Sequence, residues 1–132
     1  MTVLLAYIRT PEGDAALAAA IDEARRRETG AVVVNVTRPA AEVDSPVSAE
    51  QNLDAVAGRF AEAGVPVEVR QLEAGTDPAD AVIAVATEIG PDLVVIGLRR
   101  RTAVGKLIVG STSQRILLGV DAPVLAAKAA VR

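Results

Sequence analysis

Apolar and polar positions along this chain form blocks whose period changes in a regular way. Five short runs rich in Val, Ile, Leu and Ala have the pattern of buried or half-buried strands, at residues 3–8, 31–36, 65–72, 92–96 and 123–128. Between them, apolar residues recur every three or four positions, which predicts amphipathic helices beginning near residues 10, 48, 77 and 111. Strands that alternate with helices over the whole length indicate a parallel sheet with right-handed crossovers.

Turn and cap residues set the boundaries of these elements. Thr10-Pro11-Glu12 gives the first helix a capping hydroxyl, a proline at the first helical position and an early acid. This helix is expected to run to about Glu28 and to stop at Gly30, while Gly90-Pro91 closes the third helix. Pro66 favours an edge position for the third strand, because proline cannot donate a ladder hydrogen bond.

The expected fold class is therefore α/β, an open, doubly wound, five-stranded parallel sheet of strand order 3-2-1-4-5 with helices on both faces. Residues 1–132 are expected to form a single domain, because an apolar content of 51% is ample for one core of this size. In such a sheet the strand order reverses between the first and fourth strands. A ligand crevice opens beside their carboxyl ends.

The carboxyl end of the fourth strand carries the strongest candidate site. Gly97 is expected to release the chain just past this strand, and the cations Arg99-Arg100-Arg101 follow it. Ser111 is expected to open a Ser-x-x-Gln capping box, which leaves the backbone N–H groups of Thr112 and Ser113 facing outward. Three cations before a helix N-terminus oppose its dipole unless an anion lies between them. This predicts an anion site, with a purely structural turn and cap as the alternative.

Other charged residues have simpler explanations. Arg25-Arg26-Arg27 closes the first helix, where cations suit the helix dipole. Glu12, Asp44 and Asp77 are expected to cap helices or to stay solvated, so no metal site is predicted. Lys106 has two interpretations, a solvated loop cation or a contact to phosphate.

The amino-acid composition excludes several classes of function. The chain has neither cysteine nor histidine, which excludes disulfides, thiolate metal sites and Ser-His-Asp or Cys-His catalysis. We therefore assign no catalytic residue and expect no enzyme. A net charge of -3, with Tyr7 and Phe60 as the aromatic residues, argues against nucleic acid as a partner. The apolar runs have the length of strands, so we expect no membrane span or signal sequence and a cytoplasmic location.

Five segments carry a resemblance to a known family, at residues 3–8, 73–79, 92–97, 109–113 and 122–125. On these segments the chain resembles the universal stress protein family over essentially its full length. The family's nucleotide motif is Gly, two residues, Gly, nine residues, Gly and then Ser or Thr. Gly97, Gly110 and Ser111 match three of its four positions, and Arg100 replaces the second glycine. Ile8 stands where nucleotide-binding members often carry an aspartate.

The resemblance implies a stress-response regulatory protein that binds an adenine nucleotide, ATP or AMP, with Mg²⁺ accompanying ATP. It implies that the phosphates contact Gly97, Gly110, Ser111 and Thr112. It also implies that the backbone of Val36, at the end of the second strand, contacts adenine.

Four further residues complete the candidate nucleotide site: Ile8, Thr10, Arg99 and Arg100. Ile8 has no side-chain hydrogen-bonding group, so base specificity would rest on backbone groups. Arg100 is bulkier than glycine but supplies a forked, permanently charged donor, and we expect it to reach over the phosphates. If it blocks the site instead, a glycine there would bind the nucleotide more tightly.

The last strand predicts a homodimer. From Val124 to Ala129 the one charged residue is Lys128, and an exposed apolar edge favours pairing with a second copy, as the resemblance also implies. Lys128 could instead guard the edge against pairing. The alternative function is a homodimeric interaction module that keeps the fold without binding nucleotide, which Ile8 and Arg100 permit.

Overall fold

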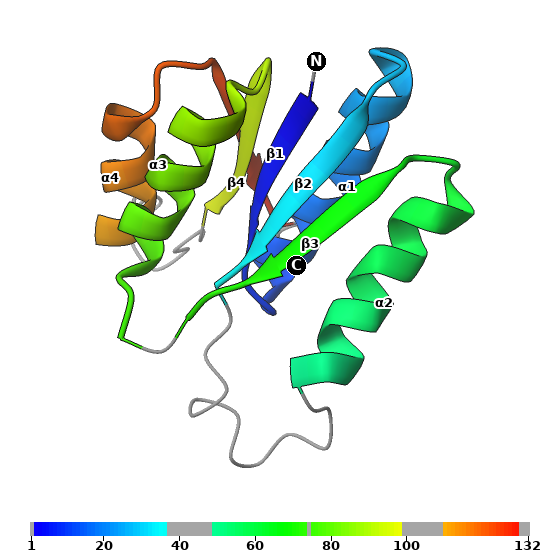
Figure 1. Cartoon of the computed structure of the whole chain (residues 1–132), viewed down its shortest axis with the longest axis horizontal. Helices are drawn as coiled ribbons and strands as arrows, with labels where there is room; N and C mark the ends of the chain where they lie inside the picture. The colour runs from blue at the N-terminus through cyan, green and yellow to red at the C-terminus, as the bar shows by residue number, and fades with distance from the viewer. Residues whose placement is uncertain (1, 37–48, 74, 99–109, 130–132) are drawn as a thin grey trace.

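The computed structural model of the chain describes residues 2–36, 49–73, 75–98 and 110–129. Within these residues, strands and helices alternate in chain order (Figure 1). The strands are β1 (Thr2–Tyr7), β2 (Gly30–Asn35), β3 (Val67–Gln71), β4 (Leu93–Leu98) and β5 (Val124–Lys128). The helices are α1 (Pro11–Arg26), α2 (Ala49–Glu62), α3 (Pro78–Ile89) and α4 (Ser111–Gly119).

The strands form one parallel sheet of order β3-β2-β1-β4-β5, which confirms the predicted topology. The order turns back between β1 and β4, so the carboxyl ends of these two strands lie side by side. β3 is an edge strand, as Pro66 predicts. Pro66 itself precedes β3, and its carbonyl accepts a hydrogen bond from the Ala31 amide at 2.9 Å.

Helices cover both faces of the sheet, as predicted. α1 and α2 pack on one face, and α3 and α4 pack on the other (Figure 1). Neighbouring strand residues alternate between the faces, so that Leu4 contacts the α3 and α4 side and Leu5 the α1 and α2 side. None of the described helices has both the length and the apolar character needed to cross a membrane.

The end of α1 differs from the expectation. The helix ends at Arg26, and Glu28, with a φ of 53°, takes the left-handed conformation that was expected of Gly30. The Thr29 amide donates to the Ala24 carbonyl at 3.0 Å, which closes a Schellman turn. Gly30 instead opens β2, where a Cβ would stand 3.0 Å from the Pro66 carbonyl oxygen. Close packing against Pro66, rather than the helix end, therefore favours a glycine here.

Tyr7 ties the end of β1 to the first turns of α1. Its side chain is 3% exposed, and its hydroxyl donates to Asp14 Oδ1 at 3.0 Å. Burial, followed by this hydrogen bond and the negative charge of Asp14, raises the pKa of Tyr7 from its ordinary 10.0 to about 12. The neutral phenol is therefore part of the folded structure.

We expect Tyr7 to ionise near pH 12 in the folded protein and near pH 10 in the unfolded protein. Because folding raises this pKa, the linked stability of about 2–3 kcal/mol is complete below pH 10 and is lost as the pH approaches 12. The chain has one tyrosine and no tryptophan, so phenolate absorbance reports this residue alone. Tyr7→Phe should remove this part of the pH dependence. Ionisation near pH 10 in the native protein would contradict the buried hydrogen bond.

Candidate functional site

The carboxyl ends of β1, β2 and β4 meet at one edge of the sheet, beside the point where the strand order reverses. The predicted site residues that the structure describes belong to the ends of these strands or the starts of the helices that follow: Ile8, Thr10, Val36, Gly97, Gly110, Ser111 and Thr112. Arg99 and Arg100 lie outside the described residues, as do Asp44 and Lys106.

Two glycines allow the start of α1 to lie directly on the sheet. A Cβ on Gly97 of β4 would stand 2.7 Å from the carbonyl carbon of Glu12 and 3.2 Å from the amide nitrogen of Gly13. A Cβ on Gly13 would stand 2.8 Å from the carbonyl carbon of Ile8. These neighbours are backbone atoms, which cannot rotate away. Gly97 is therefore required by packing, whatever it contributes to a ligand.

The expectation that Gly97 releases the chain from the fourth strand is wrong. β4 continues through Leu98, and both residues stay in parallel register with β5, opposite Ala127 and Lys128. The sheet pairing keeps the backbone extended past the glycine. The strand therefore ends later than the apolar pattern alone predicts.

The loop after β1 is fixed by its own hydrogen bonds. Thr10 caps α1 as predicted, because its hydroxyl accepts from the Gly13 amide at 3.1 Å while Pro11 occupies the first helical position. Ile8 projects from this loop with 41% of its surface exposed. Directly after β2, the amide of Val36 donates to the Tyr7 carbonyl at 2.8 Å, and the Val36 side chain is buried.

The start of α4 differs from the predicted capping box by one residue. The cap is Gly110, whose extended backbone (φ −65°, ψ 159°) precedes the helix, and Ser111 is the first helical residue. The Gln114 amide donates to the Gly110 carbonyl at 2.9 Å, which places the first helical bond there. No side chain among the described residues caps this turn. The Ser113 hydroxyl makes one long bond, 3.5 Å, to the Gly97 carbonyl.

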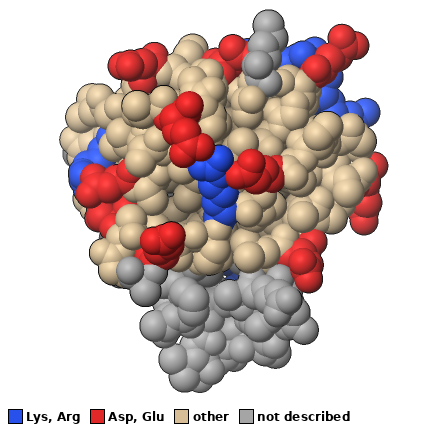
Figure 2. Space-filling view, viewed as in Figure 1, with Lys and Arg blue, Asp and Glu red and all other residues tan. Residues whose placement is uncertain are grey.

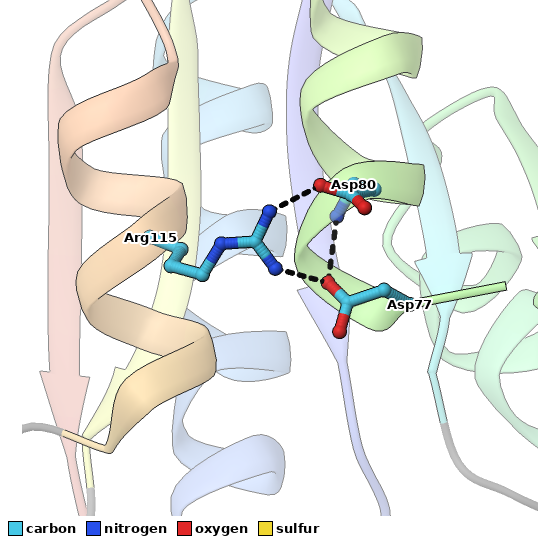
Figure 3. A network of polar contacts seen from close by, with 3 residues as sticks. All are labelled: Asp77, Asp80 and Arg115. Carbon is cyan, nitrogen blue, oxygen red and sulfur yellow. Dashed lines mark hydrogen bonds and ion pairs between the residues drawn. The ribbon is translucent and has the colours of Figure 1, made fainter.

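A cluster of three charged side chains joins α4 to the start of α3 (Figure 3). Asp77 caps α3, accepting from the Asp80 amide at 3.2 Å. Arg115 of α4 donates to Asp77 Oδ2 at 2.6 Å and also to Asp80 Oδ1. The Asp80 amide, followed by the charge of Arg115, holds the pKa of Asp77 below its usual value.

Sequence reasoning identified Asp77 as a cap but missed its ion pair with Arg115. A signal was available, because Asp77 and Asp80 lie one turn apart at the start of α3. The predicted topology also places α3 and α4 on the same face of the sheet. Gly13 was missed as well, although a glycine in the first turn of an alanine-rich helix is itself a sign of close packing.

Most of the surface seen in Figure 2 is uncharged, and its charged side chains are mainly acidic. Acidic side chains are spread over the face that carries α2, β3 and α3 (Figure 2). Arg70 of β3 is held between two of them, Glu88 at 3.0 Å and Glu68. Among the described residues, no group of three or more Asp, Glu, His or Cys residues could hold a metal ion. A negatively charged ligand therefore depends on local backbone and cationic groups.

Known proteins resemble the chain in both sequence and fold. The sequence model of the universal stress protein family matches residues 1–128. The chain belongs to the universal stress protein family. A universal stress protein of Mycolicibacterium smegmatis is 38% identical over 126 residues, which cover 96% of each chain. Universal stress proteins are generally stress-response proteins.

Solved universal stress proteins share the fold. A structure from Archaeoglobus fulgidus is 27% identical, with a TM-score of 0.79 over 97% of this chain and 98% of that one. A universal stress protein from Archaeoglobus fulgidus in complex with dAMP is 22% identical, with a TM-score of 0.73 over the same shares of the two chains.

We expect Gly97→Ala to lower the free energy of unfolding by roughly 1–3 kcal/mol in the absence of any ligand, because the new methyl group would overlap the backbone of α1. Gly58→Ala is the matched control. Gly58 lies in α2 with nothing within 4 Å of its Cβ position, so alanine there should stabilise the helix by about 0.5–1 kcal/mol. Denaturant unfolding measures both. Equal stability of Gly97→Ala and wild type would contradict the packing role.

Proposed function

We propose that this universal stress protein is a stress-response regulator that binds an adenine nucleotide, ATP or AMP, at the carboxyl edge of the sheet. The observation that carries the proposal is the start of α4. Gly110 and Ser111 are exposed, and no described side chain accepts hydrogen bonds from the first-turn amides. Such amides, at the positive end of a helix dipole, favour a phosphate. The dAMP complex of the Archaeoglobus fulgidus protein supports the choice of an adenine nucleotide.

In this proposal the phosphates accept hydrogen bonds from the backbone of Gly110, Ser111 and Thr112. Gly97 supports the site by letting α1 approach. Arg99 and Arg100, on the evidence of the sequence alone, add positive charge beside the phosphates, and Mg²⁺ would accompany ATP by binding those phosphates.

The adenine would lie between Ile8 and Val36. Because the Val36 amide is already bonded to Tyr7, the Val36 carbonyl is the backbone group that would accept from the adenine amino group. The exposed Ile8 side chain would supply an apolar contact to the ring. Thr10, whose hydroxyl caps α1, would hold this loop in place.

The nucleotide acts as a signal rather than a substrate in this proposal, and the protein works in the cytoplasm without enzymatic activity. The chain has no histidine or cysteine to serve as a base or nucleophile. The second candidate is an interaction module that binds no nucleotide. Ile8 favours this second candidate, because it is exposed and apolar at a position where a polar side chain would help to bind a nucleotide.

Ser111→Pro tests the backbone contact directly. Proline is favoured at the first helical position and lacks an N–H group, and the extended backbone of Gly110 suits a residue before proline. We therefore expect little change in stability and at least about tenfold weaker binding of AMP and ATP, from the loss of a charged hydrogen bond. Adenosine affinity should stay the same. Calorimetric titration of the three ligands measures these effects.

Ser111→Ala is the control for this experiment. It removes the hydroxyl but keeps the amide and the Gly110 cap, so its stability should match that of wild type and its AMP affinity should exceed that of the proline variant. Equal affinities of wild type and Ser111→Pro would contradict phosphate binding at this turn. Failure of wild type to bind any of the three ligands would favour the interaction module.

We also propose that two copies pair through β5, from Val124 to Ala129. Its Leu125 side chain is 37% exposed. β5 pairs with β4 on one side, which leaves its other side as an edge of the described sheet. An apolar edge strand of this kind offers its backbone groups to a second strand.

Leu125→Glu should dissociate this dimer, because it places like charges beside each other at the pairing edge. Ala61→Glu adds the same charge to an exposed position on α2 and should leave the oligomeric state unchanged. Sedimentation velocity at micromolar concentrations compares the three proteins. A wild-type monomer would contradict the proposed dimer.

A further inference from the structure

Asp77 and Asp80, which stabilise the start of α3, lie next to the start of α4, where we propose that phosphate binds. Asp77 supplies the cap of α3, and Asp80 lies in its first turn, where a negative charge suits the helix dipole. Both carboxylates reach across to Arg115 of α4 (Figure 3). Two negative charges and one positive charge therefore stand at the junction of the two helices, all about half exposed.

This junction lies close to the first turn of α4. Arg115 is four residues beyond Ser111, which corresponds to a rise of roughly 6 Å along the helix. The carboxylates it contacts are then on the order of 10 Å from the first-turn amides, about one Debye length at roughly 0.1 M salt. Without Arg115, two uncompensated negative charges would repel a phosphate at that turn.

Contacts other than this bridge also hold α4 in place. Ile116 anchors the helix in the core, and Gly119 lies so close to α3 that a Cβ there would be 2.5 Å from Ile83 Cδ1. Exposed ion pairs add little to stability, commonly about 0–1 kcal/mol. The main effect of the guanidinium is therefore on the electrostatic potential at the start of α4.

We propose that Arg115 is a positioning residue for the nucleotide site, which offsets part of the negative charge of Asp77 and Asp80 so that α3 keeps its acidic start while α4 accepts a multiply charged phosphate. This inference rests on the proposed function, because it concerns the affinity of that same site. In this role, the effect of Arg115 on binding affinity should grow with the charge of the ligand, whereas a purely structural contact would affect all ligands equally.

Calorimetric titration of Arg115→Gln with adenosine, AMP and ATP at low ionic strength tests this role. We expect unchanged adenosine affinity, about threefold weaker AMP binding and about tenfold weaker ATP binding, with the losses shrinking as salt is added. Adding Asp77→Asn and Asp80→Asn to this variant should restore ATP affinity, because asparagine keeps the α3 cap but removes both charges.

Arg26→Gln is the matched control. Arg26 also faces two acids, Asp22 at 3.0 Å and Glu23 at 3.5 Å, but at the far end of α1 from the site, so its loss should leave every affinity unchanged. Equal weakening of adenosine and ATP by Arg115→Gln, or no recovery in the triple variant, would overturn the proposal. If wild type binds no nucleotide, the proposed function fails first. If wild type binds and Arg115→Gln binds equally well, this inference alone fails.

Discussion

The architecture of the candidate site depends on how closely the first turn of α1 approaches the ends of β1 and β4. This approach is possible because Gly13 and Gly97 have no side chains where the two backbones meet. It fixes the short loop that carries Ile8, and it sets Asp14 within hydrogen-bonding distance of Tyr7. The edge of the sheet is thereby preorganised before any ligand arrives, which limits the conformational entropy that binding must remove.

Most of the fold could be predicted because the local sequence of each strand and helix indicates its type. Continuous apolar runs mark buried parallel strands, and cap residues mark where helices start. The end of α1 was misplaced because Gly30 is the usual signal for a left-handed turn, whereas Glu28 adopts that conformation here. The Schellman bond of Thr29 to Ala24 and the packing of Gly30 against Pro66 together outweigh the local preference of glutamate.

The site was less predictable because its key contacts join distant parts of the chain. Arg115 lies 38 residues from Asp77, and no local pattern encodes their ion pair. The cap of α4 was placed one residue late, since glycine and serine are both good caps and only the hydrogen bond from Gln114 distinguishes them. Gly97 shows a different difficulty. A glycine demanded by packing also matches a binding motif, so a protein of this fold would keep it even after losing its ligand.

The three-residue connection between α1 and β2 has a consequence for how this chain can vary. β2 starts directly after the Schellman turn, and Gly30 stands in register with Thr2 of β1. One extra residue in this connection, if absorbed by sliding β2, would turn every side chain of that strand to the opposite face. Five of its six residues are buried, and both sides of the sheet are packed. The fold therefore constrains the length of this connection more than its composition, and an added residue should be tolerated better in another loop.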